Sequence, residues 1–272
     1  MYLTKTRVTL RRIFRSVILD LAILISHLFS KKNGYVRCIY LHNVQDLEVD
    51  KFKSLIVYLL KNHRFITTDE LVSIIKNNIT VEENLIHLSF DDGLENLVKN
   101  AVPILNTYDI PSTVFVNSAI INASSSVKKS WDEVVRYPSS QPVMDWDSLK
   151  QSKMEIGNHT RHHCNLSNIS NNVDLLESEV IGCKNDIEKN MLTRCKYFAW
   201  PFGAMKFIDD HSIEFVKQCG HEAIFSGVRG DVIIGKTSQY LIPRNQVELY
   251  WKMSHIHFFA NGGFNQFKRE LS

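Results

Sequence analysis

The sequence predicts one α/β domain built as a barrel, closed or distorted, of about seven strand–helix units. Strand-like apolar runs alternate along the chain with helix-like runs, as parallel β/α folds require. The chain has 272 residues, of which 44% are hydrophobic and 22% charged, and this composition suits a single large domain with a well-filled core. Carboxylate, imidazole and aromatic side chains follow several of the expected strands, at the rim where α/β barrels build their sites.

Each expected element is marked by its own residue pattern. Strands are short apolar runs rich in β-branched and aromatic residues, and helices are longer runs with apolar residues every three or four positions. On these grounds strands are expected at 36–42, 85–90, 112–116, 154–158 and 197–200, with short ones near 223 and 242. Helices are expected at 51–61, 68–77, 94–106, 147–152, 172–189 and 209–219. The polar stretch 118–143 is expected to be an irregular functional loop.

Two adjacent carboxylates, Asp91 and Asp92, follow the expected strand at 85–90, and Gly93 supplies a sharp exit from it. Such a pair at the end of a strand must either repel or share a cation. Because neighbouring side chains point in different directions, one Asp can hold a metal while the other stays available as a base. The alternative is a solvated turn in which an Asp caps the following helix.

A second group of polar residues contains His159 and His163, which also follow a strand. On a turn of helix, two imidazoles four residues apart face the same way, and neutral imidazole is the commonest metal ligand in proteins. The spacing alone is weak evidence in a chain with 11 histidines. Its position at the same rim as the two Asp residues strengthens it, since two His and one carboxylate leave open positions on zinc or a similar ion.

The third segment, 198–203, ends another expected strand and contains Trp200, Pro201, Phe202 and Gly203. Pro and Gly impose a rigid exit, which can direct a backbone N–H towards a developing oxyanion. Trp200 or Phe202 offers a flat apolar face for a sugar ring or an acyl group. The alternative is an ordinary strand and turn with aromatic core residues.

Charge and cysteine content exclude several classes of protein. The net charge of +3 is too small to predict nucleic-acid binding, and no basic helix or finger motif is present. The five cysteines are scattered and form no C-x-x-C pair. This pattern argues against a disulfide framework or a structural zinc knuckle and favours a reducing compartment.

Residues 1–32 are expected to form a basic amphipathic helix at a membrane surface. The apolar run 13–29 is interrupted by Arg15, Asp20 and His27, so it fits neither a signal peptide nor a bilayer span. An interfacial helix, which tolerates polar residues along one side, is the expected form. The alternative is a basic helix packed on the domain. We expect the cytoplasm or the cytoplasmic side of the inner membrane, rather than a secreted or periplasmic location.

Taken together, these residues resemble the polysaccharide deacetylase (NodB-homology) superfamily of metal-dependent carbohydrate esterases. The resemblance runs from about residue 36 to 246 and rests on three motifs in the family's order: Ser-Phe-Asp-Asp-Gly at 89–93, His-Thr-Arg-His-His at 159–163 and Phe-Ala-Trp-Pro-Phe-Gly at 198–203. The third motif looks like the poly-N-acetylglucosamine-deacetylase branch. The resemblance implies a distorted (β/α)7 barrel in a catalytic domain at 33–272.

The same resemblance implies an activity and most of its residues. Asp92, His159 and His163 would bind a divalent metal, zinc in the first place with cobalt or nickel as alternatives. Asp91 would be the general base, and the backbone N–H of Phe202 would help to hold the oxyanion. The implied reaction removes an N-acetyl group from an N-acetylhexosamine in a polysaccharide or a lipid-linked glycan.

The chain departs from the family pattern at two positions. Ala199 stands where many members carry an Arg that orients the base, and Arg244 is expected to take that role. The usual C-terminal L-x-H motif, whose His is the acid, is missing. Because 39–42 resembles the segment that opens the circularly permuted branch, His42 is expected to protonate the leaving amine. The alternative for His42 is a buried strand histidine.

Two other functions share these sequence features. An O-acetyl carbohydrate esterase would use the same metal site, and a catalytically silent carbohydrate-binding relic would use the same fold. The relic is the weaker alternative because the three expected ligands and the base are all present. The sequence leaves the oligomeric state open.

Overall fold

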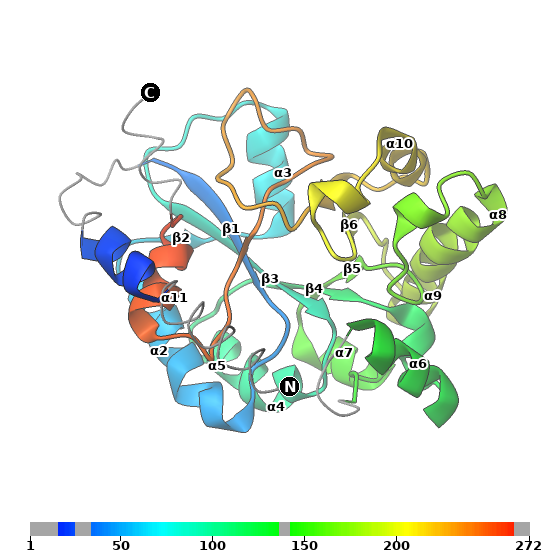
Figure 1. Cartoon of the computed structure of the whole chain (residues 1–272), viewed down its shortest axis with the longest axis horizontal. Helices are drawn as coiled ribbons and strands as arrows, with labels where there is room; N and C mark the ends of the chain where they lie inside the picture. Colours follow the sequence, from blue (N-terminus) through cyan, green and yellow to red (C-terminus); the bar gives the residue numbers. More distant parts are fainter. Residues whose placement is uncertain (1–15, 25–33, 136–141, 264–272) are drawn as a thin grey trace, which may run out of the picture.

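A curved, wholly parallel β-sheet runs through the molecule with helices packed around it, as the computed structural model shows (Figure 1). The structure describes residues 16–24, 34–135 and 142–263. The strand order is β7-β6-β5-β4-β3-β1-β8, with β2 paired to β3. The strands are β1 (Val36–Leu41), β2 (Arg64–Phe65), β3 (Leu85–Asp92), β4 (Thr113–Val116), β5 (Glu155–Asn158), β6 (Tyr197–Ala199), β7 (Ala223–Phe225) and β8 (Asn245–Gln246).

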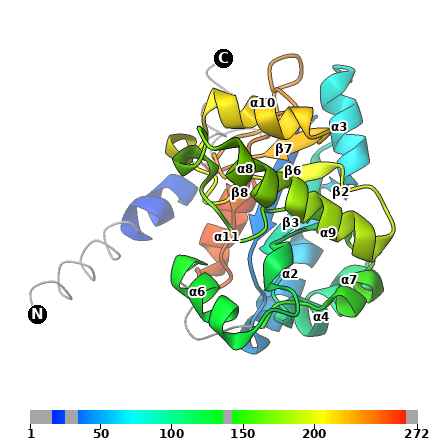
Figure 2. The same ribbon diagram turned by 90° about the vertical axis from the view of Figure 1, so that its right-hand side faces the viewer.

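Helices follow most of the strands and cover the outside of the sheet (Figures 1 and 2). They are α2 (Val49–Leu60), α3 (Thr68–Lys76), α4 (Asn96–Asn100), α5 (Val102–Thr107), α6 (Ser125–Val135), α7 (Trp146–Ser152), α8 (Val173–Leu176), α9 (Gly182–Met191), α10 (Asp210–Gln218) and α11 (Met253–Ala260). A π-helical segment, η4 (Glu177–Ile181), joins α8 to α9.

The two ends of the sheet are connected by one short segment. Ile242 forms a parallel bridge to Phe225 of β7, and three residues later Asn245 pairs with Ile39 of β1. The segment 242–246 therefore reaches from one edge of the sheet to the other and completes an irregular barrel. The predicted α/β barrel is confirmed, with the distortion at this junction.

Along strand β3, side chains alternate between the hydrophobic core under the helices and the interior of the barrel. Ile86, Leu88 and Phe90 join the main hydrophobic cluster beneath the helices. The intervening residues, from His87 to Asp91, point into the barrel, where Asp91 meets a buried arginine. Because side chains alternate between the two faces of a strand, this polar inner row ends at the carboxyl rim.

Two of the expected elements differ in the structure. The helix expected at 94–106 is divided into α4 and α5, because Pro103 lacks an N–H and its ring would clash with a continuous helix. The expectation of an irregular loop at 118–143 was wrong in part, since α6 occupies much of it. Trp131 of α6 is buried against Leu94 and Ile120, and this tertiary packing stabilises a helix whose apolar residues Val127, Trp131 and Val134 recur at helical spacing in an otherwise polar sequence. Residues 136–141 lie outside the described part of the chain.

Residues 16–24 are helical and lie against α11 (Figures 1 and 2). The carboxylate of Asp20 accepts hydrogen bonds from Lys252 at 3.0 Å and from His255 at 2.8 Å. Arg15, His27 and the remainder of residues 1–32 lie outside the described residues. Among the described helices, none has the length and apolar character needed to cross a bilayer.

A buried polar network lies at the end of the barrel opposite the carboxyl rim. The Nε2 atom of His87 is 2.9 Å from the hydroxyl of Thr68, and the hydroxyl of Thr113 donates to Glu155 at 3.0 Å. His87 also stacks on Phe225. Burial lowers the pKa of His87 to about 3, so its imidazole remains neutral in the folded protein.

This shift predicts an acid-dependent loss of stability. As pH falls below 6.5, His87 becomes protonated in the unfolded chain. In the folded protein the same ring stays neutral until the pH approaches about 3. In the presence of a chelator, His87→Gln should therefore reduce the pH dependence of the unfolding free energy by about 1.4 kcal/mol per unit between pH 6 and 4. Urea titrations measure this slope, with exposed His211→Gln as the control. An unaltered slope in His87→Gln would contradict the prediction.

Candidate metal centre and active site

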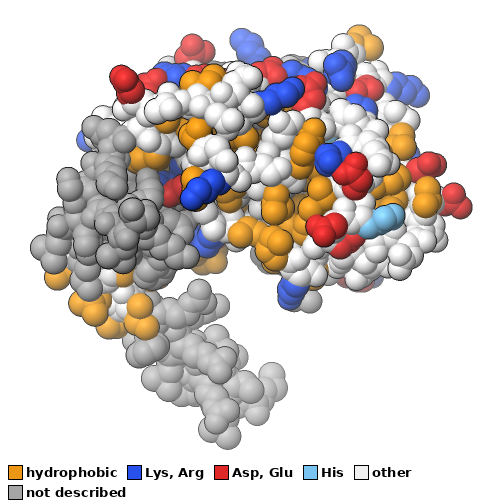
Figure 3. All heavy atoms as spheres, turned by 90° about the horizontal axis from the view of Figure 1, so that it is seen from above, with side chains coloured by type: hydrophobic (Ala, Val, Ile, Leu, Met, Phe, Trp, Pro, Cys, Tyr) orange, Lys and Arg blue, Asp and Glu red, His pale blue; other side chains and the backbone are white. Residues whose placement is uncertain are grey.

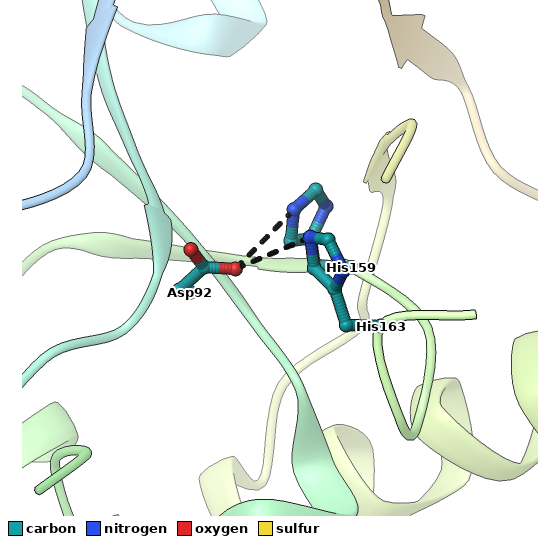
Figure 4. Close-up of side chains that lie close together, drawn as sticks. All are labelled: Asp92, His159 and His163. Carbon is teal, nitrogen blue, oxygen red and sulfur yellow. Dashed lines mark ion pairs between the residues drawn. The ribbon is translucent and has the colours of Figure 1, made fainter. Parts of the chain in front are cut away.

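Asp92, His159 and His163 lie together at the carboxyl rim of the barrel, as Figure 4 shows. One possible ligand atom from each falls within 4.8 Å of the others, and all three residues are buried. The Oδ1 atom of Asp92 is 3.6 Å from Nε2 of both His159 and His163. The three residues come from β3 and from the segment after β5, which are far apart in the sequence but separated only by β4 in the sheet.

Backbone conformation directs these side chains into the same space. Asp92 adopts a left-handed φ of 70°, which Asp tolerates, so it turns back towards the pocket that Asp91 also faces. Gly93 continues the turn at φ 67°, where an added Cβ would lie 2.9 Å from Val116. The prediction that His159 and His163 share a turn of helix was wrong. They lie on the ligand loop (residues 158–163), which starts at the last residue of β5 and continues without helical structure, and in which His163 has φ 59°.

The hydrogen bond of the His159 ring identifies its tautomer. Its Nδ1 atom lies 2.7 Å from the carbonyl oxygen of Ala199, and a carbonyl can only accept, so Nδ1 carries the proton. In the neutral ring, Nε2 then presents a lone pair towards the Asp92 carboxylate. Two acceptors face each other at 3.6 Å, which is too long for a hydrogen bond. Ligand atoms on a tetrahedral zinc, at about 2.0–2.1 Å from the ion, lie about 3.4 Å apart. The donor set therefore fits a divalent cation.

The protonation state of both imidazoles suits metal binding. Burial lowers the pKa of His159 to about 4, although the carboxylates of Asp91 and Asp92 oppose the shift. Burial also lowers the pKa of His163 to about 4. Both rings are consequently neutral at pH 7 and offer lone pairs rather than protons.

Asp91 forms a buried, bidentate ion pair with Arg244. The two guanidinium NH atoms donate to its two carboxylate oxygens at 2.7 and 2.8 Å. Arg244 is itself fixed by a bond from Nε to the carbonyl of Ser226 and by the ring of Tyr40, 4.3 Å from the guanidinium carbon. Burial alone would raise the pKa of Asp91, but Arg244 and then His159 hold it below its ordinary value. The carboxylate is therefore ionised at neutral pH.

One pocket is lined by all seven residues that the sequence predicts to bind metal or to act in catalysis. Its volume is about 180 Å³, which is smaller than the roughly 300–1,000 Å³ of typical small-molecule sites. A pocket of this volume has room for one small group of a larger molecule. Its lining residues are Tyr40, His42, Asp91, Asp92, His159, His163, Trp200, Phe202, Gly203, Gly227, Arg244 and Gln246.

His42 lies immediately after β1, at the edge of this pocket. Its ring contacts Tyr40 edge-on, and its Nδ1 atom is 3.8 Å from the carboxylate of Glu248. Burial raises the pKa of Glu248. The His42 side chain is 24% exposed, which does not fit the alternative of a fully buried strand histidine. Its role as an acid stays a prediction.

Of the two aromatic residues offered as a flat surface, Phe202 is the accessible one. Its side chain is exposed and contacts His163 edge-on, with the ring centroids 4.7 Å apart. Trp200 is buried and donates its indole N–H to the carbonyl of Phe207. Phe202 has a left-handed φ of 62°. Its neighbour Gly203 also turns left-handed, where an added Cβ would lie 2.4 Å from the backbone of Gly227. The oxyanion role of the Phe202 N–H stays a prediction.

Three residues that hold the ligand loop were missed in the sequence. The side chain of Asn117 donates to the carbonyl oxygens of His159 and Thr160, and that of Asn158 accepts from the N–H of Thr160. Both Asn residues stand where a strand ends, so their position at the rim was an available signal. Glu179 accepts from His162, and its place in the middle of a helical stretch offered no signal.

Residues 78–224, which are more than half of the chain, match the family model described as polysaccharide deacetylase. The chain belongs to the polysaccharide deacetylase family. All three metal-site residues and Asp91 lie within the matched range, whereas His42 and Arg244 lie outside it.

Curated relatives and solved structures agree with this assignment. The poly-beta-1,6-N-acetyl-D-glucosamine N-deacetylase of Staphylococcus aureus (strain MRSA252) is 26% identical over 200 residues, covering 71% of this chain and 65% of the relative. The structure of IcaB from Ammonifex degensii superposes with a TM-score of 0.70 at 17% identity, covering 85% of this chain and 98% of that one. Streptococcus pyogenes deacetylase PplD gives 0.65 at 16% identity, covering 84% and 99%. These structures share the fold.

Proposed function

We propose that this polysaccharide deacetylase family member is a metal-dependent hydrolase that removes N-acetyl groups from an N-acetylhexosamine in a polysaccharide or lipid-linked glycan. The observation that carries the proposal is the unprotonated Nε2 of His159 facing the Asp92 carboxylate at 3.6 Å. Two such acceptors, both buried, are stabilised by a cation between them. The activity that names the Staphylococcus aureus relative, a poly-beta-1,6-N-acetyl-D-glucosamine N-deacetylase, supports the choice of substrate.

The chain's own residues can perform each proton transfer of acetamide hydrolysis. A divalent cation held by Asp92, His159 and His163 would supply Lewis acidity, which lowers the pKa of water and polarises a carbonyl group. Asp91, held ionised by Arg244, would accept the proton of the attacking water. The small pocket accommodates the acetyl group, while the exposed ring of Phe202 at the rim can contact the sugar.

The remaining steps concern the oxyanion and the leaving amine. Phe202 lines the pocket with its ring against His163, and its backbone N–H would donate to the oxygen as the negative charge develops. His42 lies on the same pocket and would protonate the amine as the carbon–nitrogen bond breaks. Arg244 acts through Asp91, which it orients by two hydrogen bonds.

The experiment that tests the proposal combines metal analysis with acetate release. Purified protein should contain close to one divalent ion per chain, lose activity to a chelator and regain it with zinc, cobalt or nickel. It should release acetate from oligomers of N-acetylglucosamine or N-acetylgalactosamine. Release from O-acetylated sugars alone would identify the O-acetyl esterase instead. A protein that binds these oligomers without metal and without turnover would be the silent relic.

His42→Ala should lower kcat for acetate release by about 10²–10⁴-fold, because the leaving amine loses its proton donor. Metal content should remain that of the wild type, since His42 is not among the three clustered ligand residues. Steady-state kinetics and metal analysis of the same preparation measure both quantities, with exposed His211→Ala as the control. Near-normal turnover at full metal occupancy would refute the assignment of His42 as the acid.

We further propose that the helix at residues 16–24 lies on a membrane surface. Its polar residue Asp20 is turned towards α11, while Val17, Leu21 and Leu24 are 58–70% exposed on one face. Figure 3 shows hydrophobic side chains projecting from the end of the molecule that carries this helix. The sequence adds a basic excess within residues 1–32, which suits anionic lipid. The cytoplasmic side of the inner membrane stays our expectation.

Flotation with vesicles containing anionic lipid tests this placement. The full chain should float with the vesicles. In the triple variant Val17→Ser/Leu21→Ser/Leu24→Ser the partition coefficient should fall by at least about 10-fold, because three apolar side chains no longer enter the bilayer. The matched control replaces three exposed apolar residues elsewhere, Leu47, Val173 and Leu192, with Ser. Equal flotation of both triple variants would contradict the proposal.

A further inference from the structure

The helix that flanks the ligand loop contains a π-helical turn. Helices α8 and α9 form one continuous helical stretch with η4 (Glu177–Ile181) between them. The N–H of Gly182 bonds to the carbonyl of Glu177, five residues earlier, as in a π-helix. Such a turn contains one more residue than an α-helical turn and releases backbone carbonyls from the regular hydrogen-bond ladder. Single π-turns within α-helices are frequent at functional sites.

The backbone oxygens of this turn accept hydrogen bonds from the ligand loop. The N–H of Arg161 donates to the carbonyl of Glu179 at 3.0 Å, and the side-chain amide of Asn158 donates to that of Val180 at 2.9 Å. Gly182, directly after the turn, leaves room for the loop, since an added Cβ would lie 2.8 Å from the Arg161 side chain. The π-turn and the loop are thus packed and hydrogen-bonded as one unit.

The Glu179 side chain adds two more bonds, both to the residue before a metal-site histidine. One carboxylate oxygen accepts from the backbone N–H of His162 at 2.9 Å, and the other is 2.7 Å from its ring Nδ1. Glu179 is buried, whereas the His162 ring is half exposed and does not line the pocket. The pairing therefore holds the loop and does not place a proton donor in the site.

The conformation of His163 explains why the loop needs this support. Its φ of 59° is left-handed, which a residue with a Cβ adopts only where surrounding contacts enforce it. In that conformation its Nε2 lies 3.6 Å from Asp92. One residue earlier, the peptide N–H of His162 donates a hydrogen bond to the Glu179 carboxylate.

We propose that Glu179 is a positioning residue for the metal centre, and that the π-turn exists to direct its carboxylate onto the backbone of the ligand loop. By holding the N–H of His162, Glu179 keeps His163 in the left-handed conformation that directs Nε2 towards the other two ligands. The inference rests on the proposed function, because it requires that Asp92, His159 and His163 bind a cation.

Metal affinity in three variants at the contact tests this role, measured by competition with a chelating zinc dye. Glu179→Ala should weaken zinc binding by about 10–100-fold, the range for residues that orient metal ligands. Glu179→Gln should recover most of the loss, because its amide oxygen still accepts from the His162 N–H. His162→Ala should bind zinc nearly as the wild type does, because it keeps its backbone N–H. Glu177→Ala, exposed on the same π-turn, is the matched control.

Cobalt substitution separates positioning from general destabilisation. The visible spectrum of the cobalt-saturated protein reports ligand geometry, so it should change in Glu179→Ala and return in Glu179→Gln. Wild-type affinity and spectrum in Glu179→Ala would overturn the inference, as would a Glu179→Gln variant as impaired as Glu179→Ala. A wild-type protein that binds no metal would overturn the proposed function instead, and this is a separate result.

Discussion

Asp92→Asn should abolish tight metal binding and reduce acetate release by about 10³–10⁴-fold, which corresponds to several kcal/mol of lost transition-state stabilisation. The substitution keeps the size of the side chain and removes its negative charge. Two neutral imidazoles would then face an amide instead of a carboxylate, because the pKa of each ring is held at about 4. The loss of affinity should exceed the roughly 10–100-fold that outer-shell changes cost.

The measurement pairs zinc titration with steady-state acetate release on the same preparation. Asp147→Asn is the matched control, since the Asp147 side chain is 83% exposed and its carboxylate lies 3.6 Å from Lys150 on the same helix. Circular dichroism of both variants in chelator verifies that the barrel is folded. Wild-type zinc affinity in Asp92→Asn would show that the Asp92, His159 and His163 cluster is not the metal centre.

Arg244→Met should impair both stability and catalysis, because it leaves a carboxylate buried without its partner. Breaking a buried, hydrogen-bonded ion pair typically costs about 3–5 kcal/mol. Without the guanidinium, burial of Asp91 is opposed only by the weaker effects of His159 and His42, and its pKa should rise. The acid limb of the pH–rate profile should therefore move to higher pH, and turnover at pH 7 should fall by about 10²-fold or more.

The lowered pKa of Asp91 also determines how the stability of the protein depends on pH. In the wild type the folded pKa of Asp91 lies below its ordinary 3.8, so the pair stabilises the protein at neutral pH and this contribution is lost only in strong acid. The double variant Asp91→Asn/Arg244→Met removes both charges. It should regain part of the stability lost in Arg244→Met while remaining inactive. Urea denaturation and the pH–rate profile measure these quantities, and an unmoved acid limb in Arg244→Met would contradict the assignment.

Much of the fold was predictable because local residue patterns agree with the tertiary structure. In β3 the alternation of apolar and polar residues marks the strand, its buried outer face and the polar row that ends at Asp91. The failures occurred where packing overrides local preference. In α6 the apolar residues Val127, Trp131 and Val134 stand at helical spacing but are few in a polar segment, and burial of Trp131 in the tertiary structure stabilises the helix.

The candidate site was predictable in its residues but not in its geometry. Because the carboxyl ends of parallel strands meet at one rim, polar residues after separate strands could be expected to converge, and Asp92, His159 and His163 do converge. The expected helical turn between the two histidines was wrong, since the loop bends through a left-handed His163. Hydrogen bonds from distant elements impose that conformation, and no neighbouring residue encodes it.

The sequence by itself determined the parallel α/β barrel, the three motifs and seven of the residues that line the pocket, because these depend on periodicity and on chain order. Only the tertiary structure decided that Arg244 donates hydrogen bonds to both carboxylate oxygens of Asp91, and that the Ala199 carbonyl keeps the proton of the His159 ring on Nδ1. It also decided that Glu179 holds the ligand loop. Each of these contacts joins segments far apart along the chain, and its geometry arises only when the barrel closes.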